Sequence, residues 1–279
     1  MQAVLPVMGW FRRTAPASLT IGLAITLAWI AAAALAPVIS DYDPIAIDSA
    51  NALRAPSAAH LLGTDSIGRD VLARVLFGAR VDLLMAVAGI IGPFIIGTII
   101  GLVSGYYGRW LDTILMRILD VTISFPYFVL VIAIVAILGP GLKSYIISLT
   151  VVNWVTYARL VRSETLVLAN ADFVAAGRVL GLSNGRIMLR HVLPNAIVPS
   201  SVFVMTDAVL TIVLGSSLGF LGLGVQPPVP EWGVMIAEGR NYLASAWWIS
   251  IFPGLALCTL AFGLSLIADG LAHILDKDG

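Results

Sequence analysis

Long apolar runs alternate with short polar or Pro- and Gly-rich segments along the whole chain. A helix needs about 20 mostly apolar residues to cross the hydrocarbon core of a bilayer. By this measure we expect six membrane spans, at Ala17–Ile39, Asp82–Val103, Thr113–Leu138, Ser144–Val161, Ala196–Leu218 and Trp248–Leu271. The pattern therefore predicts an all-α polytopic membrane protein.

The segments between these runs divide the chain further. We expect an N-terminus at 1–16, a first helix at 17–39, an extracytoplasmic segment at 40–81, a five-helix core at 82–271 and a C-terminus at 272–279. Inside the core lie a polar loop at 164–195 and a second extracytoplasmic segment at 219–247. Lysines and arginines beside the spans favour both termini and the polar loop on the cytoplasmic side.

The 219–247 segment is too rich in Pro and Gly to be a regular span. Irregular backbone is not tolerated against lipid, so we expect a short re-entrant or cap-like structure sheltered by protein. Trp232, Trp247 and Trp248 suit a membrane interface.

Composition supports a membrane protein. Of the residues, 59% are hydrophobic and 11% are charged, whereas soluble domains carry about 25% charged residues. The formal net charge is zero, so no global charge favours nucleic acid. The single cysteine, Cys258, lies in an apolar run, where a buried small hydrophobe is the expected role. Glycines within the spans, such as Gly97 and Gly101, predict close helix packing.

One polar, basic segment interrupts the second half of the chain, between the fourth and fifth predicted spans. Asp172 can cap a helix whose face carries Phe173, Ala176 and Leu180. Gly181 suits the left-handed residue that ends such a helix.

A second short helix is expected after that glycine, capped by Ser183 or Asn184 and ending near Pro194. From these residues alone two interpretations stay open. The loop is either an interfacial connector whose arginines meet lipid phosphates, or a docking surface for a soluble partner.

Asp207 lies near the middle of the fifth predicted span. A carboxylate at bilayer depth is costly and is a functional hypothesis by default. It could line a pathway and meet a substrate's amino group. It could also pair with an arginine of a partner protein, or hydrogen-bond to a neighbouring span.

Other charged residues favour structural roles. Arg117 and Asp120 are spaced to share one helix face. Asp65, Arg69 and Asp70 form a compact cluster that predicts a structural turn, with contact to a partner protein as the alternative. Arg159 and Arg162 repeat the helical spacing and suit headgroup anchors or donors that brace a loop. The histidines are far apart in the sequence, so a metal site is not expected.

Sequence motifs run along nearly the full chain. They are HLLGTDSIGRDVLARVLFGAR (His60–Arg80), SGYYGRWLD (Ser104–Asp112), MRILDVTISFP (Met116–Pro126), WVTYARLVR (Trp154–Arg162), FVAAG with Gly181 and Leu193-Pro194, and GFLGLGVQPPVPEWG (Gly219–Gly233). In these ordered blocks the chain resembles the C-type subunit of the dipeptide/oligopeptide permease family of bacterial ABC importers.

The resemblance implies the type I ABC importer permease fold, with six transmembrane helices, in the bacterial inner membrane. It implies a second permease, two ATPase subunits and an extracytoplasmic substrate-binding protein as partners, besides membrane lipid, and no nucleic acid. The polar loop would be the cytoplasmic coupling loop, with contacts at Asp172, Phe173, Ala175, Ala176, Gly177, Leu180, Gly181, Leu193 and Pro194. Within that fold, the bilayer depth of Asp207 makes it a candidate for the translocation pathway.

Catalytic activity is not expected of this chain. It contains no G-x-x-x-x-G-K-[ST] phosphate-binding loop. The resemblance implies that ATP and Mg²⁺ are bound by the partner ATPase subunits, so this subunit needs no cofactor of its own.

The chain also departs from the family pattern. Ala175 stands where the coupling loop usually has Glu, and Gly177 replaces the second of two alanines. Gly215 occupies a place that is often acidic, and near the C-terminus Asp269 follows Ser-Leu-Ile-Ala rather than the usual Asn-Leu-x-Gly.

Competing functions remain open at this point. Asp207 and Asp269 would suit an ion-coupled secondary transporter, although no inverted repeat is visible. Ser216 and Ser217 would suit an intramembrane protease, but no histidine lies within a span to activate them. Within the importer class, di- or oligopeptides are favoured over nickel complexes or other small peptide-like solutes, and a heterodimeric pore over a homodimeric one.

Overall fold

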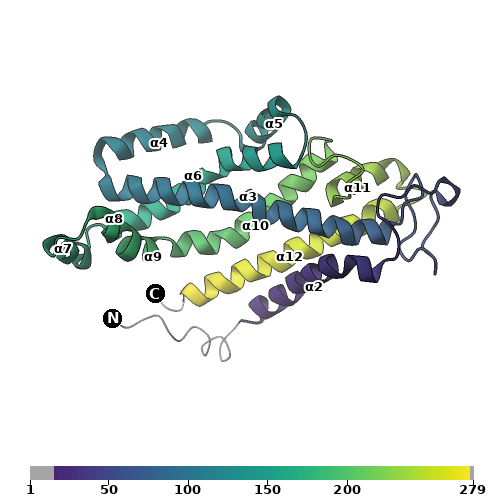
Figure 1. Cartoon of the computed structure of the whole chain (residues 1–279), viewed down its shortest axis with the longest axis horizontal. Coiled ribbons are helices and arrows are strands. Elements are labelled where there is room, and N and C mark those ends of the chain that lie inside the picture. Colours follow the sequence, from purple (N-terminus) through teal and green to yellow (C-terminus); the bar gives the residue numbers. More distant parts are fainter. Residues whose placement is uncertain (1–15, 277–279) are drawn as a thin grey trace. The chain divides into compact units, whose positions relative to one another are not determined.

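The computed structural model describes residues 16–276, which are built almost entirely from helices (Figure 1). The chain divides into two compact units. Among the described residues, the first unit comprises 16–83 and 228–276, and the second comprises 84–227. Within residues 16–276 the β-structure is limited to an isolated bridge between Thr64 and Asp70. The predicted all-α class is confirmed.

Two long helices lie side by side in the first unit (Figure 1). They are α2 (Ala17–Ile39), which matches the first predicted span, and α12 (Trp248–Asp276). A Cβ atom placed on Gly22 would lie 2.6 Å from the carbonyl oxygen of Gly263. Glycine therefore lets the two backbones approach closely.

The segment after α2 holds one 3₁₀ turn, η1 (Ser49–Asn51), before the helix α3 (Val71–Tyr107) begins. This helix starts at Val71 rather than near Asp82. Its first turns contain charge, but Arg74 is only 1% exposed and donates to Glu238 at 2.9 Å. Because the charge is paired, it does not interrupt the helix as the hydropathy pattern suggested.

The Pro- and Gly-rich segment forms a short, sheltered helix, α11 (Trp232–Gly239), followed by the 3₁₀ turn η3 (Arg240–Tyr242). The predicted interfacial position of Trp232 is wrong: its ring is fully buried and its Nε1 donates to the Val75 carbonyl at 3.0 Å. Trp248 is also buried, with its Nε1 donating to the Thr64 carbonyl at 3.0 Å. Both indole rings therefore form part of the hydrophobic core of the first unit.

The second unit contains the rest of α3 and four further long elements. They are α4 (Arg109–Ile123), α5 (Tyr127–Leu138), α6 (Leu142–Leu168) and α10 (Val198–Phe220). The third predicted span is not continuous, because α4 and α5 meet at an angle of 86°. Pro126 precedes α5, and a proline lacks the N–H that a continuing helix would use.

Glycines on α3 bring it against α6, as the sequence predicted. A Cβ atom on Gly97 or Gly101 would lie 2.5 Å from a carbonyl oxygen of α6, that of Trp154 or Ala158.

Four described helices are long and apolar enough to cross a membrane, or five if the bent pair is one span. The predicted count of six is therefore not confirmed. Helix α6 is not among them, and it carries Ser148, Asn153 and Tyr157, all buried.

Two smaller predictions remain. Cys258 is exposed, not buried, because an apolar run does not by itself distinguish a core position from the outer face of a membrane helix. The predicted termini 1–16 and 272–279 lie partly outside the described residues.

Candidate functional site

Short helical elements cluster at one end of the second unit, where α3 and α6 end (Figure 1). They are α7 (Asp172–Val179), α8 (Asn184–Ile187), the π-helical turn η2 (Met188–Val192) and α9 (Leu193–Ala196). We call residues 172–196 the coupling loop, after its predicted role. All but two of its predicted contact residues lie on or beside α7, and Leu193 and Pro194 begin α9.

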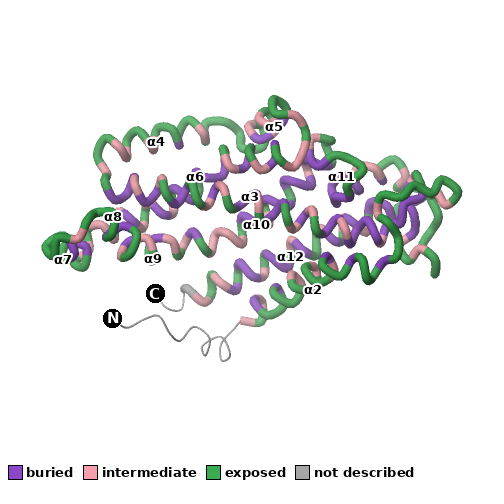
Figure 2. The backbone as a smooth tube through the Cα atoms, in the orientation of Figure 1, coloured by how far each residue is buried: buried purple, intermediate pink, exposed green. Residues whose placement is uncertain are grey.

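Helix α7 has a buried side and an exposed side (Figure 2). Val174 and Gly177 are buried. Phe173, Ala176 and Leu180 are exposed, with Leu180 at 78%. The predicted common face therefore exists and points away from the protein. Large apolar side chains exposed together are a feature of interaction surfaces.

The end of α7 follows the prediction. Gly181 has a φ of +74°, the left-handed region that favours glycine. The Leu182 N–H bonds to the Gly177 carbonyl at 3.1 Å and the Gly181 N–H to that of Arg178 at 3.0 Å. These two bonds are the Schellman pattern that closes a helix and fixes the exit direction of the chain.

The start of α7 differs from the prediction. Asp172 is the first helical residue, and Ala171, in extended conformation, is the N-cap without a side-chain bond. A turn at 169–171 sets the helix start, so the Asp172 carboxylate lies in the first turn, where it can only interact with the helix dipole.

In the second half of the loop, Ser183 caps α8 by accepting from the Arg186 N–H at 3.4 Å, as one of the two predicted alternatives. Pro194 does not end the helical path, which continues through α9 into α10. The proline lies in the first turn of α9, where a missing N–H costs no helical hydrogen bond. The π-helical turn η2 ends at Val192, and the α-helix α9 begins at the next residue.

An apolar cluster attaches the coupling loop to the long helices. Val174 and Ile187 from the loop are almost fully buried against Leu102 of α3 and Val161 of α6. A closely packed core has few voids and transmits displacement. A force applied to α7 would therefore reach both long helices.

Tyr106 adds a polar attachment next to this cluster. Its hydroxyl donates to Asn184 Oδ1 at 3.0 Å, and the Arg178 guanidinium lies 5.5 Å from its ring centroid. One residue of α3 thus contacts both α7 and α8. The sequence analysis did not single out Tyr106, although it lies in the SGYYGRWLD motif.

An ion pair ties α4 to α6 nearby. The Arg162 Nε donates to Asp112 Oδ1 at 2.5 Å and its Nη2 to Oδ2 at 2.7 Å. Ser104 of α3 also donates to Asp112. Of the roles predicted for Arg162, the structure therefore assigns that of a brace. The predicted Arg117–Asp120 pair is much weaker, at 3.8 Å with both side chains exposed.

Asp207 is buried within the second unit, at 3% exposure. Its Oδ1 accepts from Asn153 Nδ2 at 3.1 Å, and its Oδ2 accepts from the Tyr157 hydroxyl at 2.8 Å. Both donors lie on α6, so the hydrogen-bonded alternative describes its surroundings. Within residues 16–276 no cation pairs with it. Asn153 and Tyr157 lie four residues apart in a predicted span, and this helical spacing of polar side chains was the signal that the sequence offered.

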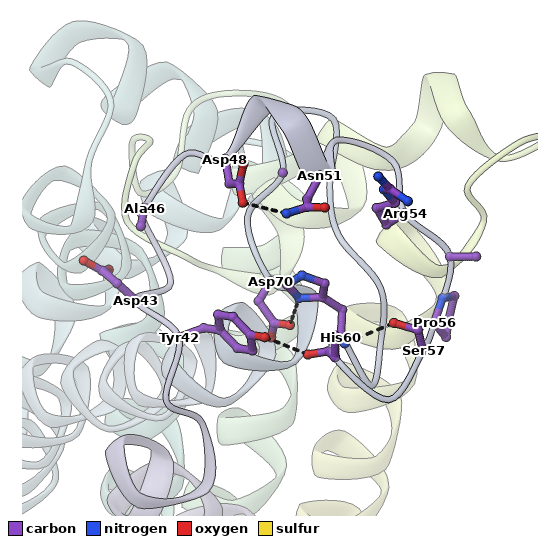
Figure 3. Close-up of a pocket in the computed structure, with 13 residues that line it drawn as sticks. Tyr42, Asp43, Ala46, Asp48, Asn51, Arg54, Pro56, Ser57, His60 and Asp70 are labelled. Atoms are coloured by element: carbon purple, nitrogen blue, oxygen red, sulfur yellow. Dashed lines mark hydrogen bonds and ion pairs between the residues drawn. The ribbon is translucent and has the colours of Figure 1, made fainter.

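Charged groups in the first unit surround an open cavity of about 780 Å³ between residues 42 and 70 (Figure 3). His60 and Asp70 meet on its wall, with Nδ1 and Oδ2 2.9 Å apart. The Tyr42 ring lies 4.8 Å from the His60 ring, and Arg54 lies on the rim. The cavity presents both signs of charge to its surroundings.

Beneath this cavity the predicted turn is present and is structural. Arg69 Nε donates to Asp65 Oδ2 at 2.6 Å, and Arg69 Nη2 to Glu238 Oε2 at 2.9 Å. These bonds link the 40–70 segment to α11 within the first unit.

Comparison with known proteins places this geometry in context. A family model described as binding-protein-dependent transport system inner membrane component matches residues 97–278. The chain is 41% identical to the dipeptide transport system permease protein DppC of Alkalihalophilus pseudofirmus over 92% of its own length and 84% of that protein.

Other relatives carry related names. The probable D,D-dipeptide transport system permease protein DdpC of Escherichia coli is 37% identical, over 96% of this chain and 89% of that one. The glutathione transport system permease protein GsiD of Pectobacterium atrosepticum is 41% identical, over 79% of this chain and 73% of that one. Among solved structures, the inward-facing MetNI methionine ABC transporter aligns with a TM-score of 0.58 at 19% identity, covering 70% of this chain and 93% of that one. This last likeness shows the fold.

Proposed function

The chain belongs to the family of binding-protein-dependent transport system inner membrane components, and we propose that it is the permease subunit of an ATP-driven peptide importer. Its fold is that of type I ABC importer permeases. In this proposal the chain forms half of a translocation pathway and is driven by ATPase subunits that bind its coupling loop.

One observation supports the coupling role most directly. Helix α7 exposes an apolar face, and its opposite face is packed against the long helices. Phe173 and Leu180 are available to a partner, while Val174 is fully buried in a cluster shared with α3 and α6. An exposed ion pair contributes only about 0–1 kcal/mol, so these apolar side chains should supply most of the affinity.

Movement follows from the attachments. When the ATPase subunits close on ATP, α7 is displaced together with α3 and α6. Packed interfaces switch between discrete arrangements rather than deforming continuously, so a small displacement becomes a rigid-body rearrangement of the spans. Asp172, Ala175, Ala176, Gly181 and Pro194 are exposed and belong to the docking surface, whereas the buried Gly177 and the partly buried Leu193 support it from behind.

Membership of the family supports the partners that we propose. A second permease completes the pathway, and an extracytoplasmic binding protein delivers substrate to the 40–70 segment, whose charged cavity is open to it. ATP and Mg²⁺ are bound by the ATPase subunits, and this chain has no nucleotide site of its own. The chain lies in the bacterial inner membrane with both termini in the cytoplasm.

Relatives named for dipeptides, D,D-dipeptides and glutathione support a short peptide as substrate. All three solutes share peptide bonds and ionised ends, and they differ in configuration, length and side chains. The alternative cargo is a nickel complex or another small peptide-like solute, and the binding protein decides between them.

A second candidate, ion-coupled secondary transport, draws on the buried Asp207. Uptake of labelled dipeptide into proteoliposomes holding the chain with its co-purified partners separates the two. The proposal predicts uptake that needs ATP and binding protein and survives ionophores that collapse proton and sodium gradients. Uptake by the chain alone, abolished by those ionophores, would overturn it.

A further inference from the structure

A second cavity lies within the second unit, at the break between α4 and α5. Its volume is about 340 Å³, within the range of small-ligand sites. Its walls come from the end of α4, the break, the start of α5 and one face of α6, namely Thr122, Ile123, Phe125, Pro126, Tyr127, Val152, Asn153, Val155 and Thr156. Non-helical backbone at membrane depth is tolerated where it lines such a cavity.

The polar groups of this cavity connect to Asp207. Asn153 forms part of the wall, yet its Nδ2 donates to Asp207 Oδ1 at 3.1 Å. The Tyr127 side chain lies on the same wall. Asp207 itself does not line the cavity. It lies behind Asn153, with Tyr157 donating to its other oxygen.

Asp207 fixes how Asn153 faces the cavity. A carboxylate can only accept, so the amide nitrogen of Asn153 must be the atom that faces it. The carboxamide oxygen is then the acceptor that Asn153 has left for a ligand. With the hydroxyls of Tyr127 and Thr156, it makes a site for a group rich in N–H donors.

Charge sets the sign of that group. Asp207 has two hydrogen bonds but no cationic partner within residues 16–276. The nearest described charges on α4, Arg117 and Asp120, pair with each other and do not line the cavity. The C-terminus of α4 and the N-terminus of α5 carry opposite partial charges, which largely cancel at the break. The charge of Asp207 therefore determines whether the cavity prefers a cation or an anion.

We propose that this cavity binds the amino-terminal ammonium group of the transported peptide, with Asn153 as the contact and Asp207 as the residue that orients Asn153 and supplies the charge. The peptide identity of the ligand rests on the proposed function. The preference for a cationic N–H donor rests on the cavity alone.

The first test probes the charge without any substrate or ATP. Thr156→Cys places a thiol on the wall, and Ser163→Cys places one at an exposed position further along α6, both in a Cys258→Ala background. Each is reacted with cationic aminoethyl and anionic sulfonatoethyl methanethiosulfonate in the purified complex. A nearby charge in partly screened surroundings contributes on the order of a tenfold preference.

We expect the ratio of cationic to anionic modification rates to be about tenfold higher at position 156 than at position 163. In the Asp207→Asn variant, the ratio at position 156 should fall to the value measured at position 163. Equal ratios at both positions, or a ratio that Asp207→Asn leaves unchanged, would overturn the proposal. These outcomes do not depend on import, so they stand even if ATP-driven uptake is not observed.

The second test probes the ligand in the otherwise native network, and it remains valid if Asp207→Asn fails to fold. A dipeptide with a free amino group should slow modification of Thr156→Cys several-fold, whereas its N-acetylated form should not. Asn153→Leu should remove this protection. Equal protection by both dipeptides, or protection that survives Asn153→Leu, would contradict an ammonium site.

Discussion

The Tyr106 hydroxyl donates to Asn184 Oδ1 at 3.0 Å, joining α3 to the coupling loop. With Arg178 over its ring, this tyrosine is a contact through which α7 and α8 both act on one long helix. The proposed coupling would therefore depend on residues behind the docking face as well as on the face itself.

Removing this contact should uncouple ATP hydrolysis from uptake. Tyr106→Phe loses one hydrogen bond, about 0.5–1.5 kcal/mol, and should reduce uptake modestly. Tyr106→Ala also loses the ring and should lower peptide uptake per ATP several-fold while ATPase subunits still co-purify. Unchanged stoichiometry in Tyr106→Ala would show that α3 does not receive the displacement through this residue.

Two glycines of the coupling loop should respond to alanine in opposite directions. A Cβ on Gly177 would make ordinary contacts of 3.5–3.6 Å with Leu182 and Ile187, so Gly177→Ala should stabilise α7 by about 0.5–1 kcal/mol. At Gly181 the φ of +74° should make alanine cost about 1–2 kcal/mol. Hydrogen exchange of the α7 amides should slow in the first variant and quicken in the second. A shift of both in the same direction would refute the cap assignment.

The Arg162–Asp112 pair should stabilise the second unit. It is largely shielded and bidentate, and hydrogen bonds to charged groups contribute about 1.5–3 kcal/mol. Arg162→Ala should lower the thermal unfolding temperature, and Arg162→Lys should do so less because lysine cannot make both bonds. Lysine and alanine variants that unfold together would argue against the bidentate geometry.

Close packing of α3 on α6 should make Gly101 intolerant of a side chain. A Cβ there would lie 2.5 Å from the Ala158 carbonyl oxygen, whereas one on Gly254 of α12 meets nothing within 4 Å. Overpacking costs about 1–3 kcal/mol. Gly101→Ala should therefore reduce folded yield and melting temperature, and Gly254→Ala should leave both near wild type. Equal tolerance would mean that the helices are further apart than described.

The exposed apolar face of α7 should set the affinity for the ATPase subunits. Phe173→Ser and Leu180→Ser remove apolar area that is free in this chain, and each should weaken co-purification several-fold. Leu61→Ser is the matched control, because Leu61 is 63% exposed but belongs to the segment predicted on the other side of the membrane. Loss of ATPase subunits with Leu61→Ser, or retention with the double α7 variant, would contradict the assignment.

Sequence patterns predicted the helices best where periodicity and backbone chemistry act locally. The first span and the left-handed Gly181 could be recognised because apolar length and glycine conformational freedom depend on neighbouring residues alone. Asp172 and Pro194 were misjudged because both roles depend on where the preceding turn leaves the chain. In α3 the pairing of Arg74 with Glu238, distant in sequence, allowed a charged stretch to be helical.

Only part of the candidate site could be predicted, because local spacing does not reveal contacts between different helices. Phe173, Ala176 and Leu180 were predicted on one face by helical spacing. The partners of Asp207 could not be identified from spacing, since Asn153 and Tyr157 lie on another helix. The bend at Pro126, which opens the second cavity, was hidden within a run that is apolar throughout.

Site-specific photo-crosslinking in native membranes tests the central claim, that α7 is where the ATPase subunits dock. A benzoylphenylalanine at Leu180 should form an adduct with an ATPase subunit, while the same probe at the buried Ile187 should not. No adduct from position 180 in membranes that still take up peptide with ATP would contradict the account.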